Sequence, residues 1–274
     1  MFHSKQSGGE TAHRSKRRFP EFEIVLQPIV DVDTRTVYAY EALCRGPYGE
    51  THPTLIADLD PSLLLSFDKL AMARSMRLAA LLRVEEKGAK ISINVGPETH
   101  LVGRDANYIA RLAKHYGIKP TSIVLEFSEG VRMDCVELAG ILENHRAAGS
   151  VIAMDDFGAG YAGLNVLAIC TPDVLKLDRE LIKDIETNKT KKTIVGAFTK
   201  ICRKIGVAII AEGVETVAEC RTLRSFGINL MQGYLFARPA SCELPRVRFP
   251  SMEQKHFSRV TRDECEWLRN AIRQ

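Results

Sequence analysis

Two adjacent acids, Asp155 and Asp156, lie where an apolar run passes directly into a glycine-rich segment, in the stretch VIAMDDFGAGYAGL at residues 151–164. Neighbouring side chains on a strand point to opposite faces, so a buried strand cannot hold both carboxylates in its interior. The pair is therefore expected where the strand ends. Two like charges this close repel each other, and a proton or a metal ion is needed to offset that repulsion.

Polar side chains also end most of the other apolar runs. They are Glu41 in YEALCR, Asn94 in SINVGP, Glu126 in VLEFSE, Lys176 in VLKLD, Glu212 in IAEGVE and Gln232 in MQGY. One such residue is ordinarily a satisfied structural acid, but several carboxylates buried around one place need cations. Hard divalent ions such as Mg²⁺ or Mn²⁺ prefer carboxylate and amide oxygens. No histidine ends these runs, which argues against zinc.

An oxygen-rich cluster of this size is large enough for two cations, and the aspartate pair could bridge them. That arrangement predicts a two-metal clamp on an in-line displacement at phosphorus. Lys176 would add a fixed positive charge that orients or activates water. The alternative for Lys176 is a surface lysine that pairs with Asp173 or Asp178.

Strand-like and helix-like stretches alternate along the chain and would position these residues. The strand candidates are EIVLQPIV, TVYAYEAL, ISINV, IVLEF, VIAMD, DVLKLD, AIIAE and NLMQGYLF, and the helical stretches are 64–85, 104–116, 135–148, a short helix from about 161, 190–205 and 216–226. Runs that are apolar on both faces indicate a parallel sheet covered by helices. Eight strands predict an α/β fold, a TIM-like (β/α)8 barrel with reactive residues at the carboxyl ends of its strands.

The first two strand candidates are joined by only DVDTR, which is too short for a parallel crossover. We therefore expect one antiparallel strand in the barrel. An open doubly wound sheet is the alternative, although neither a GxGxxG nor a GxxxxGK[ST] loop marks a nucleotide crevice.

The composition is that of an ordinary globular protein, with 45% hydrophobic and 26% charged residues among 274. Much of the net charge of +4 comes from basic residues near the start, which gives nucleic-acid binding little support. Seven scattered cysteines without a CxxC pair argue against a disulfide framework and indicate a reducing cytoplasm. No run approaches the roughly 18 apolar residues of a membrane span.

Three parts of the chain are distinguished by composition. Residues 1–20 are basic and aperiodic, and we expect a disordered arm there. Residues 21–242 would form the barrel, and residues 243–274 an extension. In that extension VTRDECEWLRNAIRQ reads as an amphipathic helix that packs on the barrel, with Val260, Cys265, Leu268 and Ile272 on one side. A partner-binding helix is the alternative.

The ordered set QPIVD, EALCR, SINV, LEFSE, DDFGAGYAGL, DVLKLD, AEGVE and QGYLFARP resembles the EAL domain of bacterial cyclic di-GMP phosphodiesterases, over roughly residues 22–240. The resemblance implies a barrel with one reversed strand and a cytoplasmic enzyme of bacterial signal transduction. Such an enzyme hydrolyses cyclic di-GMP to linear pGpG with two Mg²⁺ or Mn²⁺ ions. Ca²⁺ is expected to inhibit, because its larger and more flexible coordination suits in-line attack poorly.

The same resemblance implies a homodimer formed through the loop at 157–164 and the helix that follows it. The alternative function is a catalytically silent cyclic di-GMP receptor or protein-interaction module. Members of that kind generally lose metal ligands, and none is lost here.

The resemblance also carries residue roles. Glu41, Asn94, Glu126 and Asp155 match the ligands of one metal ion, and Asp155, Asp156 and Glu212 those of a second. Lys176, Glu212, Gln232 and Glu129 form the catalytic set, in which Lys176 would hold the attacking water, Gln232 support the site and Glu129 fix the loop. Arg45 resembles an arginine that contacts the substrate phosphate, and Gln27 is a weaker candidate for nucleotide contact. Glu215 matches a family position, with a first-turn helix acid as the alternative.

The sequence departs from the commonest family pattern at a few positions. Ala159, Ala162 and Gly163 stand in the loop where Thr, Ser and Ser are frequent, and the lost hydroxyls could have tied that loop down. Cys44 replaces an apolar residue, and Gly96 replaces a serine. None of these changes removes a predicted metal ligand.

Overall fold

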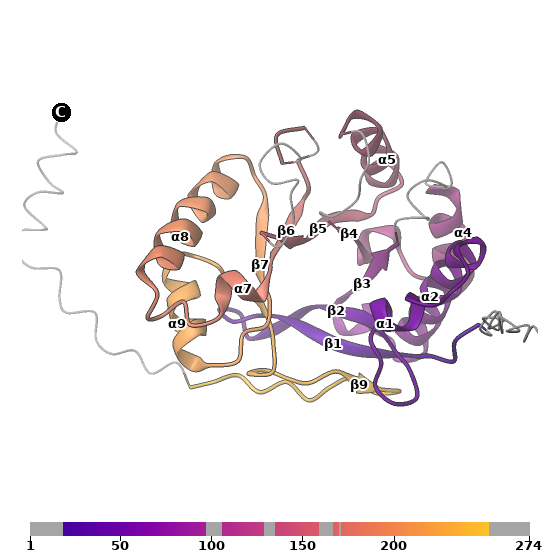
Figure 1. The fold of residues 1–274 in the computed structure, drawn as a ribbon, viewed down its shortest axis with the longest axis horizontal. Helices are drawn as coiled ribbons and strands as arrows, with labels where there is room; N and C mark the ends of the chain where they lie inside the picture. The colour runs from indigo at the N-terminus through magenta and orange to yellow at the C-terminus, as the bar shows by residue number, and fades with distance from the viewer. Residues whose placement is uncertain (1–18, 97–105, 129–134, 159–166, 170, 252–274) are drawn as a thin grey trace, which may run out of the picture.

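A computed structural model of the chain describes residues 19–96, 106–128, 135–158, 167–169 and 171–251 (Figure 1). Glu129, loop residues 159–164, nearly all of the predicted arm and the predicted helix in the extension lie outside these residues. The strands are β1 (Glu23–Asp31), β2 (Thr36–Arg45), β3 (Lys90–Val95), β4 (Ile123–Ser128), β5 (Val151–Phe157), β6 (Val174–Leu177), β7 (Ala208–Ala211), β8 (Leu230–Gln232) and β9 (Ala240–Ser241).

Eight strands form a closed barrel in the order β2-β3-β4-β5-β6-β7-β8-β1, with β1 bonded back to β2. From β2 to β8 each neighbouring pair is parallel. Strand β1 runs antiparallel to both of its barrel neighbours, and the two-residue β9 is bonded to it outside the barrel. The predicted α/β barrel with one antiparallel strand is confirmed.

Helices cover the outside of the barrel (Figure 1). The longer ones are α2 (Pro61–Leu81), α4 (Ala106–Tyr116), α5 (Cys135–Ala147), α8 (Lys189–Lys204) and α9 (Val217–Ser225); the shorter ones are α1 (His52–Ile56), α7 (Arg179–Ile182) and the 3-10 turns η1 (Glu85–Lys87) and η2 (Pro120–Ser122). Helix α2 begins earlier than predicted because Asp60 caps it and Pro61 opens it. It ends earlier because Arg83 takes a left-handed φ of 54°.

The barrel interior changes from apolar to polar within two residues on most strands. A cluster inside the barrel is formed by Ile29, Ala39, Val124, Ala153, Val174 and Ile210. Side chains two residues apart on a strand share a face. The next inward positions on the parallel strands therefore belong to Glu41, Glu126, Asp155, Lys176 and Glu212. On the reversed β1 the corresponding position is two residues earlier, at Gln27, so the same end of the barrel becomes polar all round.

Candidate active site

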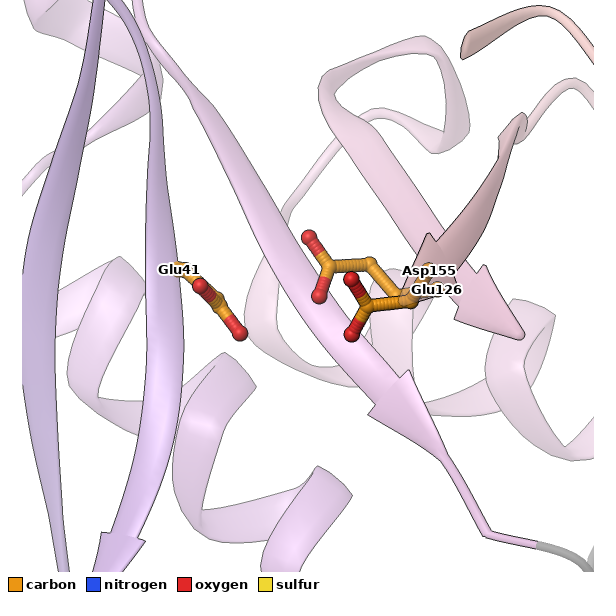
Figure 2. A group of neighbouring side chains, drawn as sticks. All are labelled: Glu41, Glu126 and Asp155. Atoms are coloured by element: carbon orange, nitrogen blue, oxygen red, sulfur yellow. The ribbon is translucent and has the colours of Figure 1, made fainter. Parts of the chain in front are cut away.

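Five acids gather at the carboxyl end of the parallel strands in two overlapping groups. Oxygens of Glu41, Glu126 and Asp155 lie within 4.8 Å of one another, and so do oxygens of Asp155, Asp156 and Glu212. Figure 2 shows the first group, with Glu41 on β2 facing Glu126 and Asp155 across a common space. Asp155 belongs to both groups. The structure thus brings together all the predicted carboxylate ligands, and in the same two sets.

Lys176 projects into the centre of these acids. Its ammonium lies 2.6 Å from Glu212, 2.9 Å from Glu126, 3.0 Å from Asp155 and 3.6 Å from Glu41. The side chain is only 1% exposed. The alternative of a surface lysine paired with Asp173 or Asp178 is therefore wrong. Asp178 instead caps α7, and Asp173 accepts the Ile152 amide.

The cluster has more carboxyl groups than the single ammonium of Lys176 can balance. Burial raises the pKa of Glu126 well above its usual range, and nearby carboxylates add to the effect. Burial likewise raises the pKa of Glu212 to about 8 despite the adjacent Lys176. Burial alone would lower the pKa of Lys176, but the surrounding acids hold it well above its usual range. The lysine is therefore charged, and it cannot by itself keep all its neighbours ionised at neutral pH. A cation would complete the charge balance.

Amide side chains fix the orientation of Glu41. Asn94 Nδ2 donates to Glu41 Oε1 at 3.1 Å, and Gln232 Nε2 donates to Glu41 Oε2 at 2.7 Å. Burial alone would raise the pKa of Glu41, but Lys176 and these two hydrogen bonds lower it. Gln232 Nε2 also reaches Gln27 Oε1 at 3.2 Å. The Gln232 Oε1 atom is buried without a hydrogen-bond partner among the described residues, so one oxygen is left for a ligand or water.

The backbone conformation at Asp156 explains how two adjacent aspartates can serve the same site. Asp156 adopts a left-handed φ of 55°, and its amide donates to Asp155 Oδ1 at 2.9 Å. Non-glycine residues rarely take this conformation, although aspartate tolerates it better than most. The turn directs the Asp156 carboxylate to the same side as Asp155. Burial and the neighbouring Asp155 raise the pKa of Asp156.

A cavity of about 740 Å³ opens above the acids and extends between β2, β3, α1 and α2. Gln27 and Arg45, the predicted nucleotide and phosphate contacts, both line it. Arg45 Nη1 donates to the Cys44 carbonyl at 2.8 Å. A cavity of this volume suits a ligand of several hundred daltons.

Sequence reasoning missed the cavity wall that faces the acids. His52 on α1 and Asp68 on α2 both line the cavity, with His52 Nε2 3.7 Å from Asp68 Oδ1. A Cβ on Gly96 would lie 2.0 Å from Asp68 Oδ2, so the glycine makes room for this carboxylate. Two signals could have found the wall: an acid within the apolar run LLLSFDKLAMA, and the glycine that ends β3.

Arg179 was also missed, and it changes the interpretation of Glu215. The Arg179 guanidinium contacts the Gly213 carbonyl, and its Nη2 lies 2.8 Å from Glu215 Oε2. Glu215 precedes Thr216, the N-cap of α9, so it is not a first-turn helix acid; Glu219 has that place. The pair ties the loop that follows Glu212 to the start of α7.

Comparison with known proteins gives the same picture. The EAL domain family model matches residues 12–239. The blue light- and temperature-regulated antirepressor BluF of Escherichia coli is 31% identical over 227 residues, which cover 81% of this chain and 55% of BluF. A cyclic di-GMP phosphodiesterase of Pseudomonas aeruginosa is 27% identical over 224 residues, covering 80% of this chain and 38% of that protein. The matched region thus spans about half or less of these relatives.

Solved structures share the fold. A standalone versatile EAL protein from Vibrio cholerae in its c-di-GMP bound form superposes with a TM-score of 0.79 at 33% identity, over 85% of this chain and 98% of that one. Klebsiella pneumoniae BlrP1, in a manganese/cy-diGMP complex, gives a TM-score of 0.74 at 31% identity, over 85% of this chain and 61% of that one.

Proposed function

This chain belongs to the EAL domain family, and from that premise we propose that it is a cyclic di-GMP phosphodiesterase acting in bacterial second-messenger signalling. The observation that carries the proposal is the pair of carboxylate groups that share Asp155 beneath the cavity. The relative from Pseudomonas aeruginosa is named for this activity, and the structures from Vibrio cholerae and Klebsiella pneumoniae hold the nucleotide.

The donor set fits two hard divalent cations. All the predicted ligands offer oxygen, the acids outnumber Lys176, and Gln232 Oε1 has no partner among the described residues. Glu41, Asn94, Glu126 and Asp155 would hold one Mg²⁺ or Mn²⁺ ion, and Asp155, Asp156 and Glu212 the second. Such ions, when bound, stabilise the developing charge on a phosphoryl oxygen and lower the pKa of an attacking water.

The reaction forms one bond between water oxygen and phosphorus and breaks one ester bond to a ribose oxygen, which opens the ring to linear pGpG. Lys176 would hold the attacking water, because its ammonium already reaches both carboxylate groups. Gln232 would keep Glu41 in place, and Arg45 and Gln27 would orient the nucleotide in the cavity. Glu129, which lies outside the described residues, would fix the loop that follows Asp156.

The proposal is tested by incubating the purified chain with cyclic di-GMP and Mn²⁺ and separating the products by chromatography. Linear pGpG should accumulate, and EDTA or an excess of Ca²⁺ should stop its formation. Asp155→Asn is the matched control, since it keeps the shape of the side chain and removes its charge. No pGpG after hours of incubation with a folded, metal-loaded chain would contradict the enzymatic function.

We further propose a cytoplasmic homodimer that pairs through the loop at 157–164 and the helix after it. The loop begins directly after Asp156, so ordering the loop in an interface would fix the Asp156 carboxylate as a metal ligand and raise turnover. The described cysteines Cys44, Cys202, Cys220 and Cys242 are free thiols, as a reducing compartment requires. Specific activity should then fall on dilution, and light scattering should show dissociation over the same concentration range. A dimer that dissociates without loss of specific activity would contradict this coupling.

One comparison favours a second candidate function, a nucleotide-binding or protein-interaction module without turnover. BluF, 31% identical, is named as an antirepressor rather than as an enzyme. Calorimetric titration with cyclic di-GMP, with and without Mn²⁺, beside the turnover assay would separate the two functions. Tight binding without product would favour the module.

A further inference from the structure

Helix α8 carries an exposed apolar row on its outer side in addition to a buried inner side. Ile194 is 50% exposed, Ile201 is 45% exposed, and Ile205, directly after the helix, is 43% exposed. Residues spaced by seven and by four lie on one helix face, so the three isoleucines form a continuous row. The part of the chain that the structure describes has seven large hydrophobic side chains this exposed, and three of them are in this outer row.

The inner side of α8 is already occupied, so the outer row is a second apolar face. Val195, Thr199 and Cys202 lie on this inner side and are buried. An exposed face of this kind on a single helix is expected to receive another apolar element.

The charge of α8 indicates what that element should carry. The helix has no acid and six bases, which are Lys189, Lys191, Lys192, Lys200, Arg203 and Lys204. Lys200 and Lys204 are exposed and lie along one edge of the outer row. A fitting occupant is therefore an amphipathic segment with acids beside its apolar side.

The residues that precede the C-terminal segment of this chain lie close to α8. Val247 and Phe249 pack against the same core cluster that contains Val195 and Cys202 of α8. The Arg35 guanidinium lies 5.0 Å from the centre of the Phe249 ring, and the Arg248 amide donates to the Phe236 carbonyl at 2.9 Å. These contacts hold residues 247–249, close to the end of the described residues, on the side of the barrel that carries α8 and α9, and the last part of the coloured ribbon lies on that side (Figure 1).

The reach of the following residues is sufficient. Residues 252–259 can span up to about 27 Å when extended, and the 16 residues of α8 are about 24 Å long. The next stretch, RVTRDECEWLRNAIRQ from residue 259, has the apolar period of an amphipathic helix and three acids in four residues, Asp263, Glu264 and Glu266.

We propose that residues 259–272 dock as a helix along the outer row of α8. Val260, Leu268 and Ile272 would cover the isoleucines, and Asp263, at the edge of that row, would lie toward Lys200 and Lys204. Covering the row in this way removes an apolar patch from water and brings an acid to the basic edge of the helix. The proposal is independent of turnover, because no residue of the row lines the catalytic cavity.

Hydrogen exchange of the full chain, followed by mass spectrometry, tests the docking. Amides of residues 260–272 should be protected, and Ile201→Asp should raise their exchange rates at least roughly tenfold. Leu81→Asp is the matched control, because Leu81 is 68% exposed at the end of α2 and likewise exchanges an exposed aliphatic side chain for an acid. That control should leave the segment protected. Ile194→Asp is a second variant in case Ile201→Asp fails to fold, which far-UV circular dichroism would reveal.

The reciprocal change completes the test. Leu268→Asp should release the segment to the same extent, and adding Ile201→Asp to it should produce no further change, because both act on one contact. Exchange of residues 260–272 at unprotected rates in the unaltered chain would overturn the proposal. So would a dimer, seen by light scattering, that Ile201→Asp dissociates and Leu268→Asp does not, since the occupant would then be a second copy.

Discussion

Two neighbouring layers inside the barrel are built on the same strands and differ in almost every other respect. The lower layer is apolar, with Val124 on β4, Val174 on β6 and Ile210 on β7 as examples. Two residues further along these strands lie Glu126, Lys176 and Glu212. Burial does not separate the layers, because Glu126 and Lys176 are each only 1% exposed.

The two layers differ in what their burial contributes to the stability of the fold. Apolar burial stabilises the fold wherever it occurs. Charges buried against one another seldom gain what they lose by leaving water. Four carboxylates around one ammonium are worse than a balanced pair, because Lys176 offsets only part of their charge. Fold stability alone gives no reason to place them there. The comparison teaches that the lower layer maintains the barrel, and that the upper layer is held at a cost for chemistry.

The largest effect expected from this comparison is the loss of turnover when the upper layer is altered. Glu41→Ala, Asp155→Asn or Lys176→Ala should each lower the rate of pGpG formation by at least about 1,000-fold, because the residues act as one unit. Each variant should remain folded, as judged by circular dichroism and gel filtration. A variant that keeps a near-normal rate at saturating Mn²⁺ would remove that residue from the proposed site.

The second effect is on stability, and it concerns Lys176 alone. Lys176→Met keeps the length of the side chain and removes its charge, which leaves four carboxylates without a buried cation. The free energy of unfolding should fall by about 3–5 kcal/mol without metal, as when one partner of a buried ion pair is removed. Saturating Mn²⁺ should restore much of the loss, because a bound cation replaces the ammonium. Urea denaturation with and without metal measures both changes.

The pH dependence of that variant has a definite sign. The pKa of Glu212, about 8 beside the lysine, would rise further without it. A carboxyl whose pKa is raised in the folded state binds protons more tightly there, so its contribution to stability falls as pH rises from about 4.5 through that pKa. The metal-free variant should therefore lose more stability at pH 9 than at pH 6. An equal loss of unfolding free energy at pH 6 and pH 9 would show that Lys176 does not affect the pKa of these acids.

The lower layer should respond in the opposite way. Ile210→Ala leaves a cavity at a fully buried position and should cost about 2–5 kcal/mol in unfolding free energy. Turnover per folded molecule should change little, because the side chain of Ile210 lies below the acids. The two measurements, urea denaturation and steady-state kinetics, are to be made on the same preparation. A large drop in kcat without a loss of stability would contradict the division between the layers.

Much of the fold could be predicted from the sequence because strand patterning and connection length act locally. The DVDTR connection allowed no parallel crossover, and β1 is antiparallel to β2 as expected. The small elements were missed because they depend on contacts. Helix α7 is only four residues long, and β9 is two residues held by β1.

The site was predictable as a set of residue types at strand ends, and its internal geometry was not. Nothing in VLKLD tells how far the Lys176 side chain reaches, and only the closed barrel brings it to four acids. The same is true of Asp68 and Gly96, which are 28 positions apart in the chain and meet through the packing of α2 against β3. Such pairs are set by tertiary contacts rather than by local pattern.

The smallest expected effect contrasts a buried thiol with the buried lysine. Cys44 faces the apolar cluster outside β2, three residues after Glu41, and burial raises its pKa to about 12. At pH 8 the thiolate, which is the form that reacts with alkylating agents, would therefore be a very small fraction of Cys44. Cys242 is exposed, so peptide mapping after brief iodoacetamide treatment should show alkylation there at least about 100-fold faster. Burial and the Asp68 carboxylate favour the neutral form of Cys44 and outweigh the opposite effect of Arg45 and Arg74, whereas Lys176 stays charged because acids surround it. Rapid alkylation of Cys44 in the folded chain would show that water reaches this position, and the contrast with Lys176 would fail.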